Sequence, residues 1–162
     1  MQVTAIYPGV FDPITRGHID LIERASRLFR VVVAVSATTV KFPLFSHSER
    51  VALAKEALAS FGSVEVQGFR GLLVQHADSC RAQVILRGLR GVSDLDYEFQ
   101  MAGANRLLRP GLETLFLRPS ECYAHLSSSL VREVALLGGD VSAFVPKNVL
   151  TALQVRAENL SV

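Results

Sequence analysis

The sequence lacks any segment that would place the protein in a membrane or mark it for export. None of its apolar stretches approaches the roughly 20 residues that are needed to cross a bilayer, and we recognise no signal peptide. Only two cysteines are present, Cys80 and Cys122, and their spacing matches no metal-binding pattern. We therefore expect a cytoplasmic protein, without membrane attachment or a side-chain metal site, whose cysteines are reduced and structural.

Several well-known catalytic and binding motifs are also missing. The sequence has no G-x-x-x-x-G-K-[ST] phosphate loop and no G-x-G-x-x-G dinucleotide fingerprint. It has no nucleophilic serine elbow, and no cysteine and histidine have the spacing of a nucleophile and its base. The net charge of +2 is too small to indicate the basic face of a duplex-DNA-binding protein. We expect no nucleic-acid partner, and phosphate chemistry that proceeds without a covalent intermediate.

What the sequence does contain is a regular alternation of apolar runs and helix-period segments. Its 162 residues, 49% of them hydrophobic, suffice for one ordered domain spanning residues 1–162. Five runs are strand candidates: Val3–Tyr7, Val31–Ala37, Val64–Gln67, Val84–Leu86 and Thr114–Leu117. This alternation predicts a doubly wound, Rossmann-like α/β fold, in which a parallel five-stranded sheet carries helices on both faces. From Ser127 onward the chain reads as a helical C-terminal segment.

The helical segments are identified by apolar spacing and by capping residues. The first has apolar residues at spacings of three and four, namely Ile19, Ile22, Ala25 and Phe29. The second begins at Ser46, where Glu49 completes a capping box, and its apolar face comprises Val51, Ala54, Leu58 and Phe61. The remaining helices are expected at residues 72–80, 93–108, 127–137 and from about 146, with a break at Gly138-Gly139.

Polar and glycine-containing segments follow four of the five predicted strands. In a doubly wound sheet, ligands bind outside the carboxyl ends of the strands, so these segments should meet at one edge. They are residues 9–18, 38–41, 87–90 and 118–129. The convergence of cations, hydroxyls and glycines at this edge predicts an anion-binding site.

Individual residues at this edge suit phosphate. Gly17-His18 falls at a helix start, where unpaired N–H groups and the helix dipole attract anions. Arg87 and Arg90 could grip phosphate oxygens from two sides, and Lys41 lies in a loop between two of the strands. Ser127-Ser128-Ser129 opens a later helix and offers more hydroxyls than one N-cap requires. Such groups can catalyse displacement at phosphorus by positioning and charge stabilisation.

Two of these segments carry a family resemblance. Pro8-Gly9-x-Phe11-Asp12-Pro13-x-Thr15-x-Gly17-His18 and Leu126-Ser127-Ser128-Ser129-x-x-Arg132 together resemble the paired signatures of the nucleotidylyltransferase superfamily. Over essentially its whole length the chain is similar to the bacterial phosphopantetheine adenylyltransferase family, with supporting stretches at residues 87–90, 96–101 and 138–141. That family transfers the adenylyl group of ATP to 4′-phosphopantetheine, with Mg²⁺, and yields dephospho-coenzyme A and pyrophosphate in the penultimate step of coenzyme A synthesis.

The resemblance implies roles for individual residues. His18 would stabilise charge at the α-phosphate, while Lys41 and Arg87 would hold the pantetheine phosphate or the transferring group. Leu73 would line the pantetheine side, and Val10 would meet the acceptor through its backbone N–H. The implied ATP contacts are Val10, Phe11, His18, Gly88, Leu89, Arg90, Glu98 and the run Tyr123, Ala124, His125, Leu126, Ser127, Ser128 and Ser129. The resemblance also implies a homohexamer that coenzyme A inhibits by feedback.

The chain departs from the family pattern at Val10, where threonine or serine is usual. Valine keeps the shape of threonine but lacks a hydroxyl that could bond the attacking phosphate. We expect an active but slower enzyme, since a lost hydrogen bond to a charged group costs about 1.5–3 kcal/mol.

Alternative functions remain open at this point. The same fold could use nicotinamide mononucleotide as acceptor, or transfer a cytidylyl group to a small phosphorylated alcohol. A non-catalytic nucleotide-binding module is a further alternative, and it is supported by Val10, which lacks the hydroxyl that is usual at this position. A fragment of a class I aminoacyl-tRNA synthetase would share the Gly-His signature, although such enzymes are longer than this chain.

Overall fold

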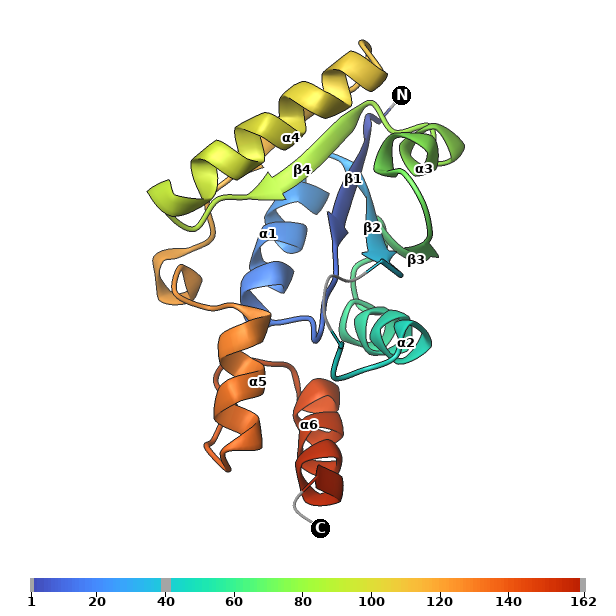
Figure 1. Ribbon diagram of the computed structural model, residues 1–162. Coiled ribbons are helices and arrows are strands. Elements are labelled where there is room, and N and C mark those ends of the chain that lie inside the picture. The colour runs from blue at the N-terminus through green and yellow to red at the C-terminus, as the bar shows by residue number, and fades with distance from the viewer. Residues whose placement is uncertain (1, 39–41, 161–162) are drawn as a thin grey trace.

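A computed structural model describes residues 2–38 and 42–160 of the protein. Within them, strands and helices alternate as predicted (Figure 1). The strands are β1 (Thr4–Gly9), β2 (Arg30–Ser36), β3 (Val64–Phe69), β4 (Val84–Gly88) and β5 (Glu113–Leu117). The α-helices are α1 (Arg16–Ser26), α2 (His47–Ala57), α3 (Leu73–Ser79), α4 (Leu95–Leu108), α5 (Ser128–Leu136) and α6 (Lys147–Leu160). Two single-turn 3-10 helices, η1 (Val92–Asp94) and η2 (Glu121–Tyr123), precede α4 and α5.

The five strands form one parallel sheet in the order β3-β2-β1-β4-β5. The chain first builds outward from β1 through β2 to β3, and then crosses to the other side of β1 to add β4 and β5. The strand order therefore reverses between β1 and β4. In sheets of this kind the crevice at the carboxyl ends of such a strand pair is where ligands bind.

The core lies on both faces of the sheet, because successive side chains of a strand point to opposite sides. Ala5 and Tyr7 of β1 pack in one cluster, together with buried residues of α1, α2, α5 and α6. Ile6, between them, belongs to a second cluster with Val74 and Ala77 of α3. Helices thus cover both faces of a fully buried central strand, and the predicted doubly wound fold is confirmed.

The capping box predicted at the start of α2 is confirmed. The Ser46 hydroxyl accepts a hydrogen bond from the N–H of Glu49 at 3.3 Å, and the Glu49 carboxylate accepts one from the N–H of Ser46 at 2.7 Å. The predicted ends of two helices were too late, because Phe29 and Phe61 lie beyond the last residues of α1 and α2. Both rings still pack against the core. The apolar spacing of Phe29 and Phe61 therefore indicates that their side chains pack against the core, not that the residues are helical.

The C-terminal helices lie at the carboxyl end of the sheet. Figure 1 shows α5 and α6 beyond the ends of β1 and β2, next to the first turn of α1. The N–H of Arg16 donates to the carbonyl of Phe144, which joins the start of α1 to the segment before α6. Helices α5 and α6 therefore border the carboxyl edge of the sheet, where the predicted site residues lie. Among the described residues, no helix has the length and apolar character needed to span a membrane.

Candidate active site at the ends of β1 and β4

Two adjoining clefts open at the point where the strand order reverses. The larger has a volume of about 710 Å³ and lies between the β1–α1 turn, the end of β4 and the first turn of α5. The smaller, of about 260 Å³, lies between α4 and the start of α3. Both sizes are reasonable for parts of a small-molecule site. The residues that line both clefts are Pro8, Gly9, Val10, Arg87, Tyr97 and Glu98.

His18 stands in the first turn of α1 and lines the larger cleft. Its Nδ1 lies 3.0 Å from the backbone nitrogen of Thr15. Since a backbone N–H can only donate, Nδ1 must accept, and the proton of the neutral ring is therefore on Nε2. Burial, together with the positive charge of Arg90, lowers the pKa of His18 from 6.5 to about 4. At neutral pH this residue is an uncharged hydrogen-bond donor at a helix N-terminus.

Arg87, at the end of β4, is held by Glu98 from α4. Its Nε and Nη2 donate to the two carboxylate oxygens at 2.7 and 2.6 Å, and its Nη1 donates to the carbonyl of Pro8 at 3.1 Å. Burial disfavours the charged guanidinium, but the hydrogen bond and charge of Glu98 outweigh it and raise the pKa of Arg87. A bidentate pair of this kind fixes the plane of the guanidinium as well as its position.

Arg90 makes weaker contacts and is the more available cation. Its Nη1 lies 3.4 Å from the carbonyl of Leu126, its Nε lies 3.4 Å from the Asp94 carboxylate, and 45% of its side chain is exposed. Arg87 and Arg90 thus both line the larger cleft, as predicted for a clamp. In this structure, however, the main partners of Arg87 are protein groups.

The three serines at the start of α5 have different partners. Ser127 is the N-cap, and its hydroxyl accepts from the N–H of Leu130 at 3.1 Å. Ser128 donates its hydroxyl proton to the carbonyl of Pro13 at 2.8 Å, whereas the Ser129 hydroxyl accepts from Arg132 at 3.2 Å. All three line the larger cleft. The N–H groups of the first turn have no intrahelical acceptor, so the α5 N-terminus faces this cleft with anion-binding capacity.

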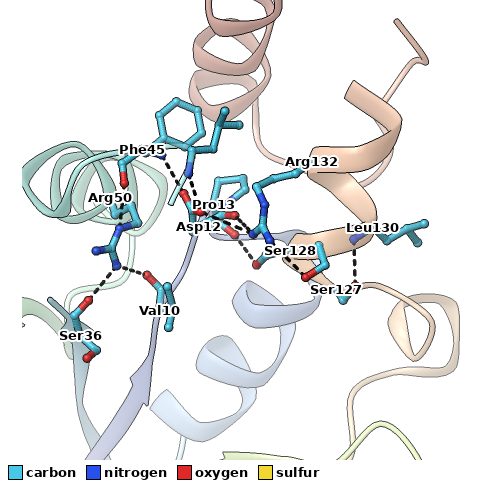
Figure 2. Close-up of polar contacts among 12 residues, drawn as sticks. Val10, Asp12, Pro13, Ser36, Phe45, Arg50, Ser127, Ser128, Leu130 and Arg132 are labelled. Atoms are coloured by element: carbon cyan, nitrogen blue, oxygen red, sulfur yellow. Dashed lines mark hydrogen bonds and ion pairs between the residues drawn. The ribbon is translucent and has the colours of Figure 1, made fainter. Parts of the chain in front are cut away.

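Three charged residues to which the sequence analysis assigned no role hold the β1–α1 turn (Figure 2). The buried Asp12 carboxylate accepts from the N–H groups of Leu44 and Phe45 at 2.8 and 2.9 Å. Arg132 donates to the carbonyl of Asp12 at 2.5 Å, and Arg50 donates to the carbonyl of Val10 at 2.5 Å. A sequence signal for Arg132 was present, since this residue belongs to the quoted serine motif. A signal for Arg50 was also present, because its position four residues before the buried Ala54 places it on the buried face of the helix.

The structure brings together most of the predicted site residues. Those that line the larger cleft are Val10, Phe11, His18, Arg87, Gly88, Arg90, Glu98, Tyr123, Leu126, Ser127, Ser128 and Ser129. Leu73 lines the smaller cleft, together with Val10, Arg87 and Glu98. Leu89, Ala124 and His125 line neither cleft. Lys41 lies outside the described residues.

Comparison with known proteins identifies the family of the chain. The family model described as cytidylyltransferase-like matches residues 6–134. A phosphopantetheine adenylyltransferase from Thioalkalivibrio sulfidiphilus is 61% identical over 157 residues, which cover 96% of this chain and 99% of that protein. The chain belongs to the phosphopantetheine adenylyltransferase family. A further relative of that name, from Methylococcus capsulatus, is 62% identical over 94% of this chain and 95% of its own length.

A solved structure supports the fold. A crystal structure from Vibrio parahaemolyticus, assigned provisionally as a nicotinate-nucleotide adenylyltransferase, superposes with a TM-score of 0.66. The match covers 96% of this chain and 93% of that one, at 18% sequence identity. The Rossmann-like architecture of this chain is therefore shared by a protein of low sequence identity.

Proposed function

We propose that this protein transfers the adenylyl group of ATP to 4′-phosphopantetheine, giving dephospho-coenzyme A and pyrophosphate. The observation that carries the proposal is the meeting of two unlike clefts at the ends of β1 and β4. ATP would occupy the larger, which is lined by His18, Arg90 and the α5 N-terminus. The pantetheine arm would occupy the smaller, which Phe69, Leu73 and Met101 make largely apolar and to which Asn105 adds an amide.

The reacting groups would meet at the residues shared by both clefts. A phosphate oxygen of the acceptor attacks the α-phosphorus of ATP, and the bond from that phosphorus to the oxygen bridging the β-phosphate breaks. Pyrophosphate leaves as the new phosphoanhydride forms. The backbone at Val10 and the oriented Arg87 line both clefts, and the acceptor phosphate would bind beside them. No covalent enzyme intermediate is needed, because positioning and charge stabilisation can supply the catalysis.

His18 would serve as the donor to the α-phosphate. Its Nε2–H is available because Thr15 occupies Nδ1, so the neutral ring can donate a hydrogen bond to a phosphate oxygen. The N-terminal end of the α1 dipole adds favourable potential for the charge that develops there. Arg90 and the first turn of α5 would hold the β- and γ-phosphates, which leave together as pyrophosphate.

Mg²⁺ would enter as the complex with ATP. The described residues contain no group of three or more histidine, cysteine, aspartate or glutamate side chains placed to hold a metal ion. Mg²⁺ usually keeps several waters and binds through substrate phosphates, which is compatible with the donors of the larger cleft. The ion would supply charge neutralisation on the leaving pyrophosphate.

Two regulatory and assembly properties accompany the proposed reaction. Coenzyme A contains both an adenine nucleotide and a pantetheine arm, so it would span both clefts and compete with both substrates. A homohexamer would cover exposed apolar side chains of α4 and β5, which include Tyr97, Phe99 and Leu115. Light scattering should then give a mass of about six times the 17.7 kDa of the chain.

One assay tests the assignment. Purified protein is incubated with ATP, Mg²⁺ and a single acceptor, and pyrophosphate release is followed. We expect release with 4′-phosphopantetheine and none with nicotinamide mononucleotide, or with a small phosphorylated alcohol when CTP replaces ATP. Release with another acceptor alone would refute the assignment. Binding of ATP without release with any acceptor would indicate a non-catalytic nucleotide-binding module.

A further inference from the structure

Arg50 is a charged residue in the protein interior that no step of the proposed reaction uses. It lies in the first turn of α2 and is 1% exposed. Its guanidinium donates to three backbone carbonyls: Phe45 at 3.2 Å, Ser36 at 2.8 Å and Val10 at 2.5 Å. Burying a guanidinium carries a high desolvation cost. A leucine or methionine would fill the same space without that cost.

The three carbonyls belong to segments that meet at the reaction centre. Ser36 ends β2, Phe45 precedes α2, and Val10 follows β1 at the junction of the two clefts. Figure 2 shows the guanidinium between these segments, with Val10 at the end of the β1 arrow. Arg50 is therefore hydrogen-bonded to the stretch of backbone at which the acceptor phosphate is proposed to bind.

The backbone next to Val10 needs such support. Phe11 has a φ of +50°, in the left-handed region that a residue with a bulky side chain rarely adopts. Conformations of this kind are unfavourable and persist only when their surroundings hold them. The two residues next to Phe11 each have a backbone carbonyl that accepts a hydrogen bond from an arginine. Arg50 donates to the carbonyl of Val10, and Arg132 donates to the carbonyl of Asp12. Because C=O and N–H point in opposite directions across a trans peptide, fixing the Val10 carbonyl also fixes the N–H of Phe11.

We propose that Arg50 is a positioning residue for adenylyl transfer, which holds the Val10 carbonyl and thereby fixes the turn in which the N–H of Val10 is proposed to meet the acceptor phosphate. The inference rests on the proposed function, since it concerns the same reaction centre. Arg50 lines neither cleft and would act through the backbone carbonyls that it bonds, above all that of Val10. Its loss should therefore lower turnover more than it weakens the binding of ATP, whose other contacts come from α1, β4 and α5.

The test compares Arg50→Lys with a matched control, Arg156→Lys. Lysine keeps the positive charge at position 50 but cannot reach three carbonyls in the planar fork of a guanidinium. Arg156 bonds Glu49 at 2.6 Å and lies over the Phe45 ring, so it packs beside Arg50 without contacting the Val10 turn. We expect Arg50→Lys to lower kcat by about 10- to 100-fold, with the KM for ATP changed less than threefold. Arg156→Lys should retain kcat within about twofold.

A second measurement separates positioning from general damage and needs no turnover. In the amide spectrum of ¹⁵N-labelled protein, the N–H resonance of Phe11 should move in Arg50→Lys and stay in place in Arg156→Lys. An active parent whose kcat is unchanged in Arg50→Lys would overturn the positioning role. So would a kcat loss that Arg156→Lys reproduces at equal thermal stability. If the parent releases no pyrophosphate with phosphopantetheine, the proposed function fails, and the shift of Phe11 still tests whether Arg50 holds this peptide.

Discussion

His18 should titrate far below an ordinary histidine, and this difference can be measured as protein stability. The perturbation is a fall in pH from 7 to 5, applied to the parent protein and to His18→Gln. In the folded protein Nδ1 accepts the Thr15 N–H, and burial with the charge of Arg90 lowers the pKa to about 4. In the unfolded chain the ring has its usual pKa of 6.5. The unfolded state therefore binds the extra proton throughout the range between 6.5 and 4.

The magnitude follows from these two pKa values. A group whose pKa is lowered on folding contributes its full stability above the unfolded value, and that contribution is lost as pH falls toward the folded value. At pH 5 the ring is about 97% protonated in the unfolded chain but only about 10% in the folded protein. The parent should thus lose about 2 kcal/mol more of its free energy of unfolding than His18→Gln between pH 7 and pH 5.

Urea unfolding of both proteins at both pH values provides the measurement. Carboxylates also begin to titrate in this range, but they are common to the two proteins and cancel in the comparison. A pH-dependent loss that is the same in both proteins would refute the argument that His18 is held neutral. Its proposed role as an uncharged donor to the α-phosphate would then have to be replaced by that of an imidazolium cation.

Substitutions at three positions test the site further. His18→Ala should lower kcat by about 10²–10³-fold, the usual cost of removing one donor from a developing oxyanion, and His18→Gln should lose less because its amide can still donate; equal losses would contradict the donor role. Val10→Thr should raise kcat/KM for phosphopantetheine by about tenfold, since the added hydroxyl can bond the attacking phosphate, and Val10→Ala is the control that should show no gain. Glu98→Ala should lower the free energy of unfolding by about 3 kcal/mol, because it leaves Arg87 charged and without its carboxylate partner in a half-buried position. An unchanged urea midpoint would contradict this. Glu98→Gln, which keeps one hydrogen bond to Arg87, should lose less stability.

The fold was predictable because its signals are local and repeated. Strands such as β1 and β2 are short apolar runs, and helices such as α1 and α2 have an apolar period or a capping residue such as Ser46. The location of the site followed from one rule of topology, which places ligands at the carboxyl ends of parallel strands. The side-by-side arrangement of β1 and β4 was not predicted. It depends on long-range pairing, such as that of Ile6 with Ile85, which leaves no periodic trace in the sequence.

The residues that hold the site together were harder to find, since charged side chains are normally read as solvated. Arg50 directly follows the exposed polar residues Ser48 and Glu49 of α2, and its spacing from Ala54 and Leu58 places it on the buried face. Asp12 lies in a motif that attracted attention for its glycines and histidine. Its carboxylate nevertheless binds two N–H groups more than 30 residues away. Such long-range partners become visible only when the turn and the loop before α2 are placed together.

The pairing of these charges changes how the site must work. A sequence with several cations at one sheet edge predicts a strongly positive pocket, but among the described residues most of this charge is already engaged. Arg87 is paired with Glu98, Arg132 approaches Asp12, and His18 is neutral. Among the described residues, phosphate binding would therefore draw on Arg90, on the oriented Arg87, on helix N-termini and on backbone N–H groups whose directions are fixed in advance. Dipoles oriented before substrate arrives need no reorganisation when charge develops, and the buried Arg50 would therefore contribute to catalysis by holding the backbone rather than by touching phosphate.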